Sequence, residues 1–272
     1  MNKIDFIFTI EVENANPNGD PLADNMPRTD IEEHGIISDV CIKRKIRNRL
    51  QDMGEQIFVK SNEKSDDGCN SLEERYSKIF DKKSKDVEII TESCKRWIDV
   101  RTFGQVFTYD SKAIGIRGPL SINIAKSLNK ININTMQITK SVNGQKKPEG
   151  KSSDTIGSKV FIDYGVYVVY GSINSNFAEK TGFTKEDSEK IKEAIRTLFV
   201  NDASSARPDG SMRVKDIFWF NHSSSLGDMS SYEIKQLFKF DETEENIYEK
   251  YNIRIDKENL NDKIEMEYIK GI

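Results

Sequence analysis

Histidine and cysteine are scarce in this chain of 272 residues, which contains two histidines and three cysteines. The cysteines Cys41, Cys69 and Cys94 form no CxxC pair and are odd in number, which argues against a disulfide framework and against a zinc site. We therefore expect reduced thiols that are buried or idle. His34 and His222 leave little material for histidine-based metal binding or acid–base catalysis. The sequence predicts no metal and no cofactor.

Long apolar runs are also missing. No stretch approaches the roughly 20 apolar residues that a membrane-spanning helix needs. The chain starts at once with an alternating strand pattern, where a signal peptide would place an apolar run. The sequence therefore predicts a cytoplasmic protein, long enough to bury a sizeable core in one large domain or two small ones.

Charge is distributed unevenly along the chain. Residues 241–272 contain ten acidic and five basic side chains, a net of −5, whereas the whole chain carries −4, so the rest is slightly basic. The sequence pI of about 5.5 lowers the expectation of nonspecific nucleic-acid binding. Local clusters nevertheless decide which ligands a groove attracts.

The strongest basic cluster is the stretch "SDVCIKRKIRNRL" at residues 38–50. Ser38 is a good N-cap, and Asp39 lies in the first turn, where the helix dipole favours a negative charge. The apolar stripe of the predicted helix consists of Ile42, Ile46, Leu50 and Met53. Lys43, Arg44 and Arg47 flank one side of this stripe, and Lys45 and Arg49 flank the other. Two interpretations stay open: solvated sides of an amphipathic helix, or a binding surface that lacks acidic partners other than Asp39.

Hydrophobic periodicity predicts a mixed α+β fold. Residues 4–12 alternate as a strand packed on one face, and a long polar loop follows to residue 35. Residues 54–98 are typical of an insertion, with helices near 71–80 and 91–98. Further strand material is expected at 98–109, 114–125, 160–174 and 212–222, and a helix with a Thr184–Asp187 capping box at 184–199. The polar segment 139–159 is either a loop or the tip of a long hairpin. This order is the βαββαβ order of a ferredoxin-like or RRM-like core.

Six ordered motifs together carry a resemblance to a known family: "NPNGDPLADNMPRTD", "SDVCIKRKIRN", "DVRTFGQVFT", "IRGPLSINIAKSL", "YGVYVVYGSIN" and "NDASSARPDGSM". With them, residues 3–240 resemble the backbone subunit of type I CRISPR surveillance complexes (Cascade), most like the type I-C branch, with type I-B as second choice. Residues 241–272 carry no motif of this family.

The resemblance implies a modified RRM-like palm (residues 1–53, 99–138 and 160–240), a helical finger insertion (54–98), a hairpin thumb (139–159) and an acidic C-terminal segment (241–272). Family members are not enzymes. Several copies stack along one CRISPR RNA, and the thumb of one copy crosses to its neighbour. The implied partners are CRISPR RNA, target DNA, further copies of the chain, a guide-processing subunit and a large subunit.

The same resemblance implies which residues contact nucleic acid. It assigns RNA contacts to Ser38, Lys43, Arg44, Arg47, Asn16, Asn18, Arg28, Arg101, Arg117 and Gly118. It also implies that four lysines face target DNA, namely Lys78, Lys82, Lys83 and Lys85. A guide must be held without its sequence being read, so charges and backbone N–H groups on phosphates suit this task. Gly118 would let the backbone approach a ribose or phosphate closely, although a β-bulge is an alternative explanation for it.

Other interpretations of these residues remain open. Arg28 and Arg101 could form internal salt bridges with Asp20, Asp30 or Asp99. The aromatic residues Tyr164, Tyr167, Tyr170, Trp97 and Trp219 are expected in the core. Asp20, Asp24, Asp30 and Asp39 could hold Mg²⁺ beside a phosphate, as in a type III-like target-RNA nuclease, although turns and caps also explain them. A third alternative is an RNA-binding adaptor that does not polymerise.

Overall fold

A computed structural model describes residues 1–139 and 156–272 of the chain. Its centre is an antiparallel sheet with the strand order β14-β11-β1-β10-β8-β4, and β7 and β9 pair along β10. The strand bounds are β1 (Ile4–Ala15), β4 (His34–Ile37), β7 (Leu120–Ile122), β8 (Ala125–Lys130), β9 (Ile133–Thr139), β10 (Ile156–Ile173), β11 (Met212–Asn221) and β14 (Glu265–Lys270). The strands predicted at 4–12, 160–174 and 212–222 are therefore confirmed.

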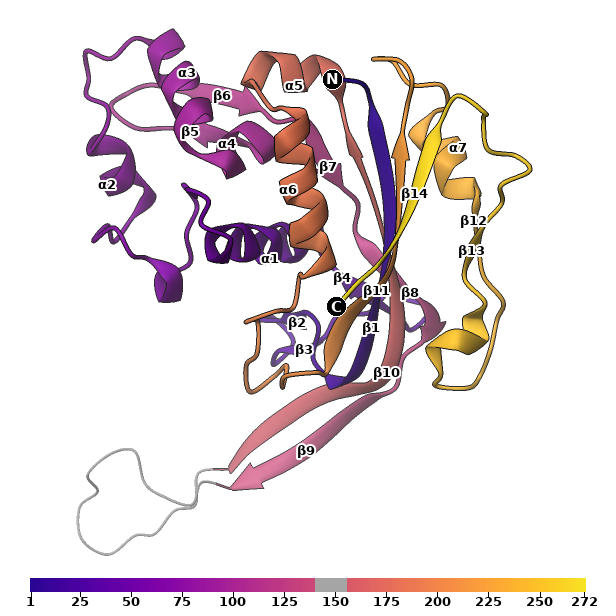
Figure 1. Ribbon diagram of the computed structural model, residues 1–272. Coiled ribbons are helices and arrows are strands. Elements are labelled where there is room, and N and C mark those ends of the chain that lie inside the picture. Colours follow the sequence, from indigo (N-terminus) through magenta and orange to yellow (C-terminus); the bar gives the residue numbers. More distant parts are fainter. Residues whose placement is uncertain (140–155) are drawn as a thin grey trace, which may run out of the picture.

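Strand β1 is buried on both faces, so the prediction of a strand packed on one face is wrong. Phe6 and Phe8 enter the main core together with Trp219, while Ile7 enters a separate core on the other side of the sheet. The physical reason is that helices cover one face and the C-terminal part of the chain covers the other (Figure 1).

The helical face carries α1 (Asp39–Asp52) and α6 (Lys185–Arg196), with α5 (Ser175–Thr181) before α6. Ile42, Ile46 and Leu50 of α1 are fully buried in the main core, and Met53 packs against it, which confirms the predicted stripe. In α6, Thr184 and Asp187 form the predicted capping box. Their hydrogen bonds satisfy two backbone N–H groups at the start of the helix.

The opposite face of the sheet is covered by α7 (Ser231–Gln236), β12 (Phe238–Lys239), the 3₁₀ turn η2 (Tyr248–Tyr251) and β13 (Arg254–Ile255). Tyr248 and Tyr251 pack on Tyr164 and Val166 of β10. Strand β14 pairs with β11 and forms one edge of the sheet. The acidic C-terminal segment is thus part of the folded sheet and its cover.

Residues 54–117 pack around a second core that contains Phe58, Tyr76, Trp97 and Phe107. Its elements are η1 (Asn62–Lys64), α2 (Leu72–Ser77), α3 (Asp86–Arg96), α4 (Ile98–Phe103), β5 (Gly104–Phe107) and β6 (Ile114–Arg117). The helices predicted at 71–80 and 91–98 exist with different bounds.

The strand predicted from residue 98 is wrong for residues 98–103, which form helix α4. Ile98 belongs to the main core and Val100 to the second core. Alternate residues of a strand point to the same face, whereas residues two apart in a helix point about 200° apart. A helix therefore lets these two side chains enter two different cores.

Strands β9 and β10 form a two-stranded ribbon that projects from the sheet (Figure 1). The pairing runs from Ile133 opposite Ile162 to Thr139 opposite Ile156. The ribbon leads into the segment predicted as a thumb, most of which, residues 140–155, lies outside the described residues. In the described ranges, no helix is long and apolar enough to cross a membrane.

Candidate nucleic-acid interface

The N-terminus of α1 is joined to the long polar loop that follows β1. The side-chain oxygen of Asn18 accepts a hydrogen bond from the backbone N–H of Ser38 at 2.9 Å. Ser38 caps α1, since its Oγ accepts from the N–H of Cys41 at 3.3 Å. Asn16 is buried and donates to the carbonyl of Asn25 at 2.6 Å. The structure therefore brings Asn18 and Ser38 together and uses Asn16 to shape the loop.

The same loop contains the small ladder β2 (Gly19–Asp20) and β3 (Met26–Pro27). Arg28 lies next to it and forms a salt bridge with Asp20 at 3.2 Å, one of the internal pairs considered from the sequence. Asp20 also accepts from the N–H of Leu22, and Asp30 accepts from two backbone N–H groups and pairs with Lys126. These carboxylates are turn-forming groups.

Within residues 1–139 and 156–272, no group of three or more histidine, cysteine or acidic side chains is arranged to bind a metal ion, and this includes the acids considered for a nuclease. The three cysteines, Cys41, Cys69 and Cys94, are free thiols, as expected, and the last two are buried. Burial raises the pKa of the Cys94 thiol to about 11, which disfavours the reactive thiolate.

Each of the five basic side chains of α1 has a polar partner, and Asp39 is not the only acid among them, since Asp99 and Asp202 also pair with this helix. Lys43 pairs with Asp39 one turn earlier at 2.9 Å. On the same flank, Arg44 donates to the carbonyl of Val59 at 2.6 Å. Arg47 donates through Nε to the buried carboxylate of Asp99 at 3.1 Å. The missed partner of Arg47 is 52 residues away in the sequence, a separation that no helix-spacing rule addresses.

The other flank of α1 is occupied by the loop that contains residues 201–211. Lys45 is buried and forms an ion pair with Asp202, and Arg207 lies 3.6 Å from the same carboxylate. Burial lowers the pKa of Lys45 despite the attraction of Asp202. The N–H of Asn16 donates to the carbonyl of Ala206 at 2.9 Å, which joins this loop to the polar loop after β1. The loop contains one of the six motifs that carry the family resemblance, but no role was predicted for Asp202 or Arg207.

Two further predicted RNA contacts have internal partners. Arg101 makes a bidentate salt bridge to Asp187 of α6, with distances of 2.7 and 2.9 Å, and this partner was not among the acids considered. The guanidinium of Arg117 lies 4.9 Å from the ring centroid of Phe177.

Gly118 is needed for packing within the protein. A Cβ at this position would lie 2.3 Å from the carbonyl oxygen of Thr102 and 2.4 Å from the backbone nitrogen of Gly104. The close approach seen in the structure thus involves the backbone of the chain itself, and the approach of Gly118 to RNA stays a prediction.

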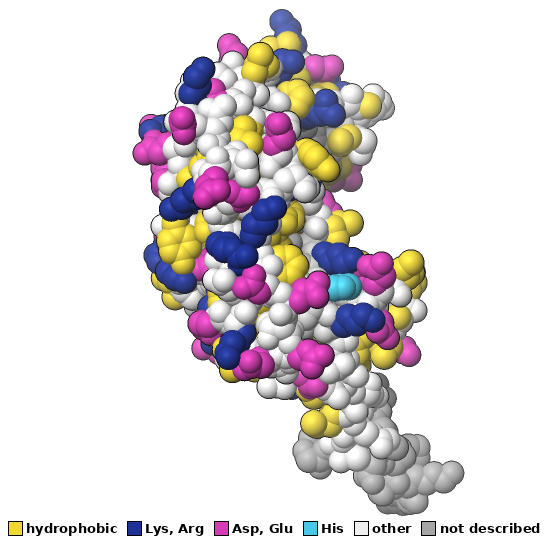
Figure 2. All heavy atoms as spheres, turned by 90° about the vertical axis from the view of Figure 1, so that its right-hand side faces the viewer, with side chains coloured by type: hydrophobic (Ala, Val, Ile, Leu, Met, Phe, Trp, Pro, Cys, Tyr) yellow, Lys and Arg dark blue, Asp and Glu magenta, His cyan; other side chains and the backbone are white. Residues whose placement is uncertain are grey.

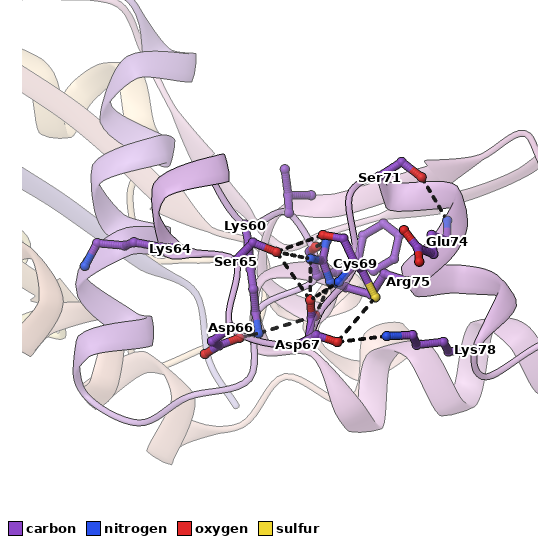
Figure 3. Close-up of polar contacts among 12 residues, drawn as sticks. Lys60, Lys64, Ser65, Asp66, Asp67, Cys69, Ser71, Glu74, Arg75 and Lys78 are labelled. Carbon is purple, nitrogen blue, oxygen red and sulfur yellow. Dashed lines mark hydrogen bonds and ion pairs between the residues drawn. The ribbon is translucent and has the colours of Figure 1, made fainter.

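The lysines of the predicted finger lie on an exposed surface of the second core. Lys78 donates to the carbonyl of Asp67 at 2.8 Å. Figure 3 shows this region, in which Asp67 also accepts hydrogen bonds from Arg75 and thereby closes the loop before α2. The ammonium groups of Lys82, Lys83 and Lys85 are exposed and form no ion pair with any described side chain.

Charge on the opposite face does not favour nucleic acid. Figure 2 shows the face formed largely by the C-terminal elements, where basic and acidic side chains are interspersed. Neighbouring charges of both signs cancel the long-range field that would attract a polyanion. Tyr164 is buried beneath this face, and Tyr167 and Trp219 are buried in the main core on the other side of the sheet, as expected.

These features define an α+β sheet protein with a projecting ribbon, a helical insertion and a polar loop cluster at the start of its first helix. Residues 2–256 match the family model described as "CRISPR-associated protein Cas7". The chain belongs to the Cas7 family.

Individual relatives agree with this assignment. The chain is 26% identical over 215 residues to the CRISPR-associated protein Cas7 of Haloferax volcanii, a match that covers 70% of this chain and 62% of that protein. The chain thus spans less than two thirds of the length of this relative.

The fold is similar to that of a chain in a solved "CRISPR RNA-guided surveillance complex, pre-nicking", with a TM-score of 0.52 and 13% sequence identity. The likeness covers 80% of this chain and 78% of that one, and it concerns the fold.

Proposed function

We propose that this protein binds CRISPR RNA without reading its sequence and serves as a filament-forming backbone subunit of a type I surveillance complex. The observation that carries the proposal is the Cas7 match, which extends over residues 2–256 and includes the loop cluster at the start of α1. The sequence motifs are most similar to the type I-C branch, with type I-B second. Proposed partners are CRISPR RNA, target DNA, further copies and the guide-processing and large subunits, in the cytoplasm.

The strand order supports an RRM-like palm. Strands β11, β1, β10 and β8 are adjacent in that order and antiparallel, α1 follows β1, and α6 follows β10. This is the arrangement that a βαββαβ chain forms in ferredoxin-like folds. We further propose residues 54–98 as the finger and residues 139–159 as the thumb.

The helical side of the sheet is the better candidate for the RNA surface. Its α1 flank carries Lys43 and Arg47, each paired with one carboxylate, and Arg47 uses only its Nε in that pair. The other side of the sheet is sealed by the C-terminal segment and carries mixed charge. Phosphate contacts of this kind hold a strand in place and leave the bases free to pair.

Salt dependence tests the proposed contacts. For single strands, log K falls by about 0.7 per log unit of salt for each phosphate neutralised. The double variant Lys43→Ala/Arg47→Ala should therefore reduce the slope by about 1.4, while binding stays independent of spacer sequence. The matched control Lys257→Ala/Lys263→Ala removes two exposed charges from the C-terminal segment and should leave the slope unchanged. An unchanged slope in a folded Lys43/Arg47 variant would contradict these contacts.

Two measurements separate this function from its alternatives. The mass of the complex purified with its RNA should correspond to several copies of the chain, whereas an adaptor would give a 1:1 complex. RNA and DNA strands complementary to the guide should remain full length in Mg²⁺ or Mn²⁺. Regular cleavage that is lost on replacing Asp20, Asp24 or Asp30 by alanine would favour the nuclease instead.

A further inference from the structure

Asp99 is a fully buried carboxylate at the junction of the palm and the finger. It lies in the first turn of α4 and is 0% exposed. Its Oδ1 accepts from the N–H of Phe58 at 2.8 Å, and its Oδ2 accepts from the N–H of Val59 at 3.0 Å and from Nε of Arg47 at 3.1 Å. A buried carboxylate is tolerated when hydrogen bonds and an opposite charge compensate it. Here two backbone N–H groups and the guanidinium of Arg47 do so.

Arg47 is held on two sides. Asp99 binds its Nε, and the ring of Phe103 lies beneath the guanidinium with its centroid 4.6 Å away. The two Nη atoms make no hydrogen bond to any residue within the described ranges and are not among the buried atoms that lack a partner, so they retain contact with solvent. A guanidinium fixed in this way presents two N–H groups as a rigid fork, which matches two oxygens of a phosphate.

We propose that Asp99 is a positioning residue of the RNA interface, which orients Arg47 so that its Nη edge meets a backbone phosphate of the guide. This inference rests on the proposed function. The same carboxylate binds the backbone of Phe58 and Val59, and Arg44 donates to the carbonyl of Val59 at 2.6 Å. One buried group therefore fixes both the phosphate-binding side chain and the chain segment that enters the finger.

The sign of the effect distinguishes positioning from simple electrostatics. A carboxylate beside a phosphate site repels the phosphate, so replacing it by a neutral amide should strengthen RNA binding if charge alone matters. If Asp99 orients Arg47, the Asp99→Asn change makes the Arg47 side chain mobile in the free protein. RNA binding must then immobilise this long side chain. Immobilising such a side chain weakens binding by about 2- to 10-fold.

The experiment compares Asp99→Asn, Arg47→Ala and the double variant for binding to single-stranded guide RNA across a salt series. We expect Asp99→Asn to weaken binding by about 2- to 10-fold with an unchanged salt slope, because the guanidinium charge remains. Arg47→Ala should lower the slope by about 0.7, and Asp99→Asn should cause no further loss in that background. Asp216→Asn, which neutralises a buried carboxylate on the opposite side of the sheet, is the matched control and should leave binding unchanged.

Asp99 also holds the chain segment at Phe58 and Val59, and hydrogen exchange at these two amides reports on this role. The exchange rate should increase in Asp99→Asn. If that variant does not fold, Phe103→Leu removes the ring beneath Arg47 while Asp99 stays in place, and it should weaken binding at an unchanged salt slope. Suppose that Arg47→Ala weakens binding. Equal or tighter binding by Asp99→Asn would then overturn the inference, and so would unchanged binding by Phe103→Leu if Asp99→Asn is unfolded. No loss in Arg47→Ala would instead overturn the proposed RNA contact itself.

Discussion

Replacing Tyr248 by phenylalanine removes one hydroxyl from the interface between the C-terminal segment and the sheet. The side chain is 5% exposed, and its hydroxyl donates to the Oδ2 of Asp216 at 2.6 Å and is hydrogen bonded to Thr9. Tyr268 and Lys270 still bind the other oxygen of Asp216 in the variant. The variant therefore loses the hydrogen bond to Thr9 and, above all, one hydrogen bond to a charged group.

Such a bond contributes about 1.5–3 kcal/mol to the free energy of unfolding, and the remaining partners of Asp216 favour the lower half of this range. A loss of about 2 kcal/mol should lower the Tm by about 3–4 °C in a chain of this size. The control Tyr251→Phe changes a buried ring in the same 3₁₀ turn, whose hydroxyl has no hydrogen-bond partner among the described residues. It should change stability by less than about 0.5 kcal/mol.

The pH dependence gives a second test of the same hydrogen bond. Burial alone would raise the pKa of the Asp216 carboxyl, but hydrogen bonds from Lys270, Tyr248 and Tyr268 outweigh it and hold the pKa below its usual value of 3.8. A carboxyl with a depressed pKa stabilises the fold above its unfolded-state pKa, and this contribution is lost as pH falls through the folded-state pKa. The Tm difference between wild type and Tyr248→Phe should thus be full at neutral pH and shrink in acid.

Thermal unfolding followed by circular dichroism at several pH values measures these differences. Equal Tm shifts in Tyr248→Phe and Tyr251→Phe would refute the assignment of the stabilisation to the hydroxyl. Guide affinity should be unchanged in both variants, because the network lies on the side of the sheet opposite to α1. A loss of affinity in the folded Tyr248→Phe protein would contradict the proposal that the RNA surface lies on the α1 side of the sheet.

Two substitutions test the internal roles found for a basic residue of α1 and for one predicted contact residue. Lys45→Met should cost about 2–4 kcal/mol in chemical denaturation, because it leaves the carboxylate of Asp202 with only the more distant Arg207, and it should not change the salt slope of guide binding. Gly118→Ala should cost about 3 kcal/mol, since its Cβ would collide with rigid backbone, whereas Gly115→Ala in the adjoining strand has open space and should be nearly neutral. Equal stability of the two alanine variants would contradict the packing explanation for Gly118.

Local chemistry was enough to predict much of the fold. The Ser38 cap, the stripe through Ile42, Ile46 and Leu50, and the Thr184 capping box all follow from interactions between residues three or four apart. The long β-branched and aromatic run of β10 likewise predicts a buried strand from its own composition. These elements were predictable because the groups that stabilise them are close neighbours in the sequence.

The surroundings of the site depended on tertiary structure. Arg47 meets Asp99 across 52 positions, and Lys45 meets Asp202 across 157, so no spacing rule could tell which base pairs with which acid. Residues 98–103 have strand-like composition, yet they form a helix, because Ile98 packs in the main core and Val100 in the second core. The sequence by itself determined that α1 is an amphipathic basic helix. Only the packing of residues 58–99 and of the 201–211 loop against that helix decided which of its charges are neutralised inside the protein and which still face solvent.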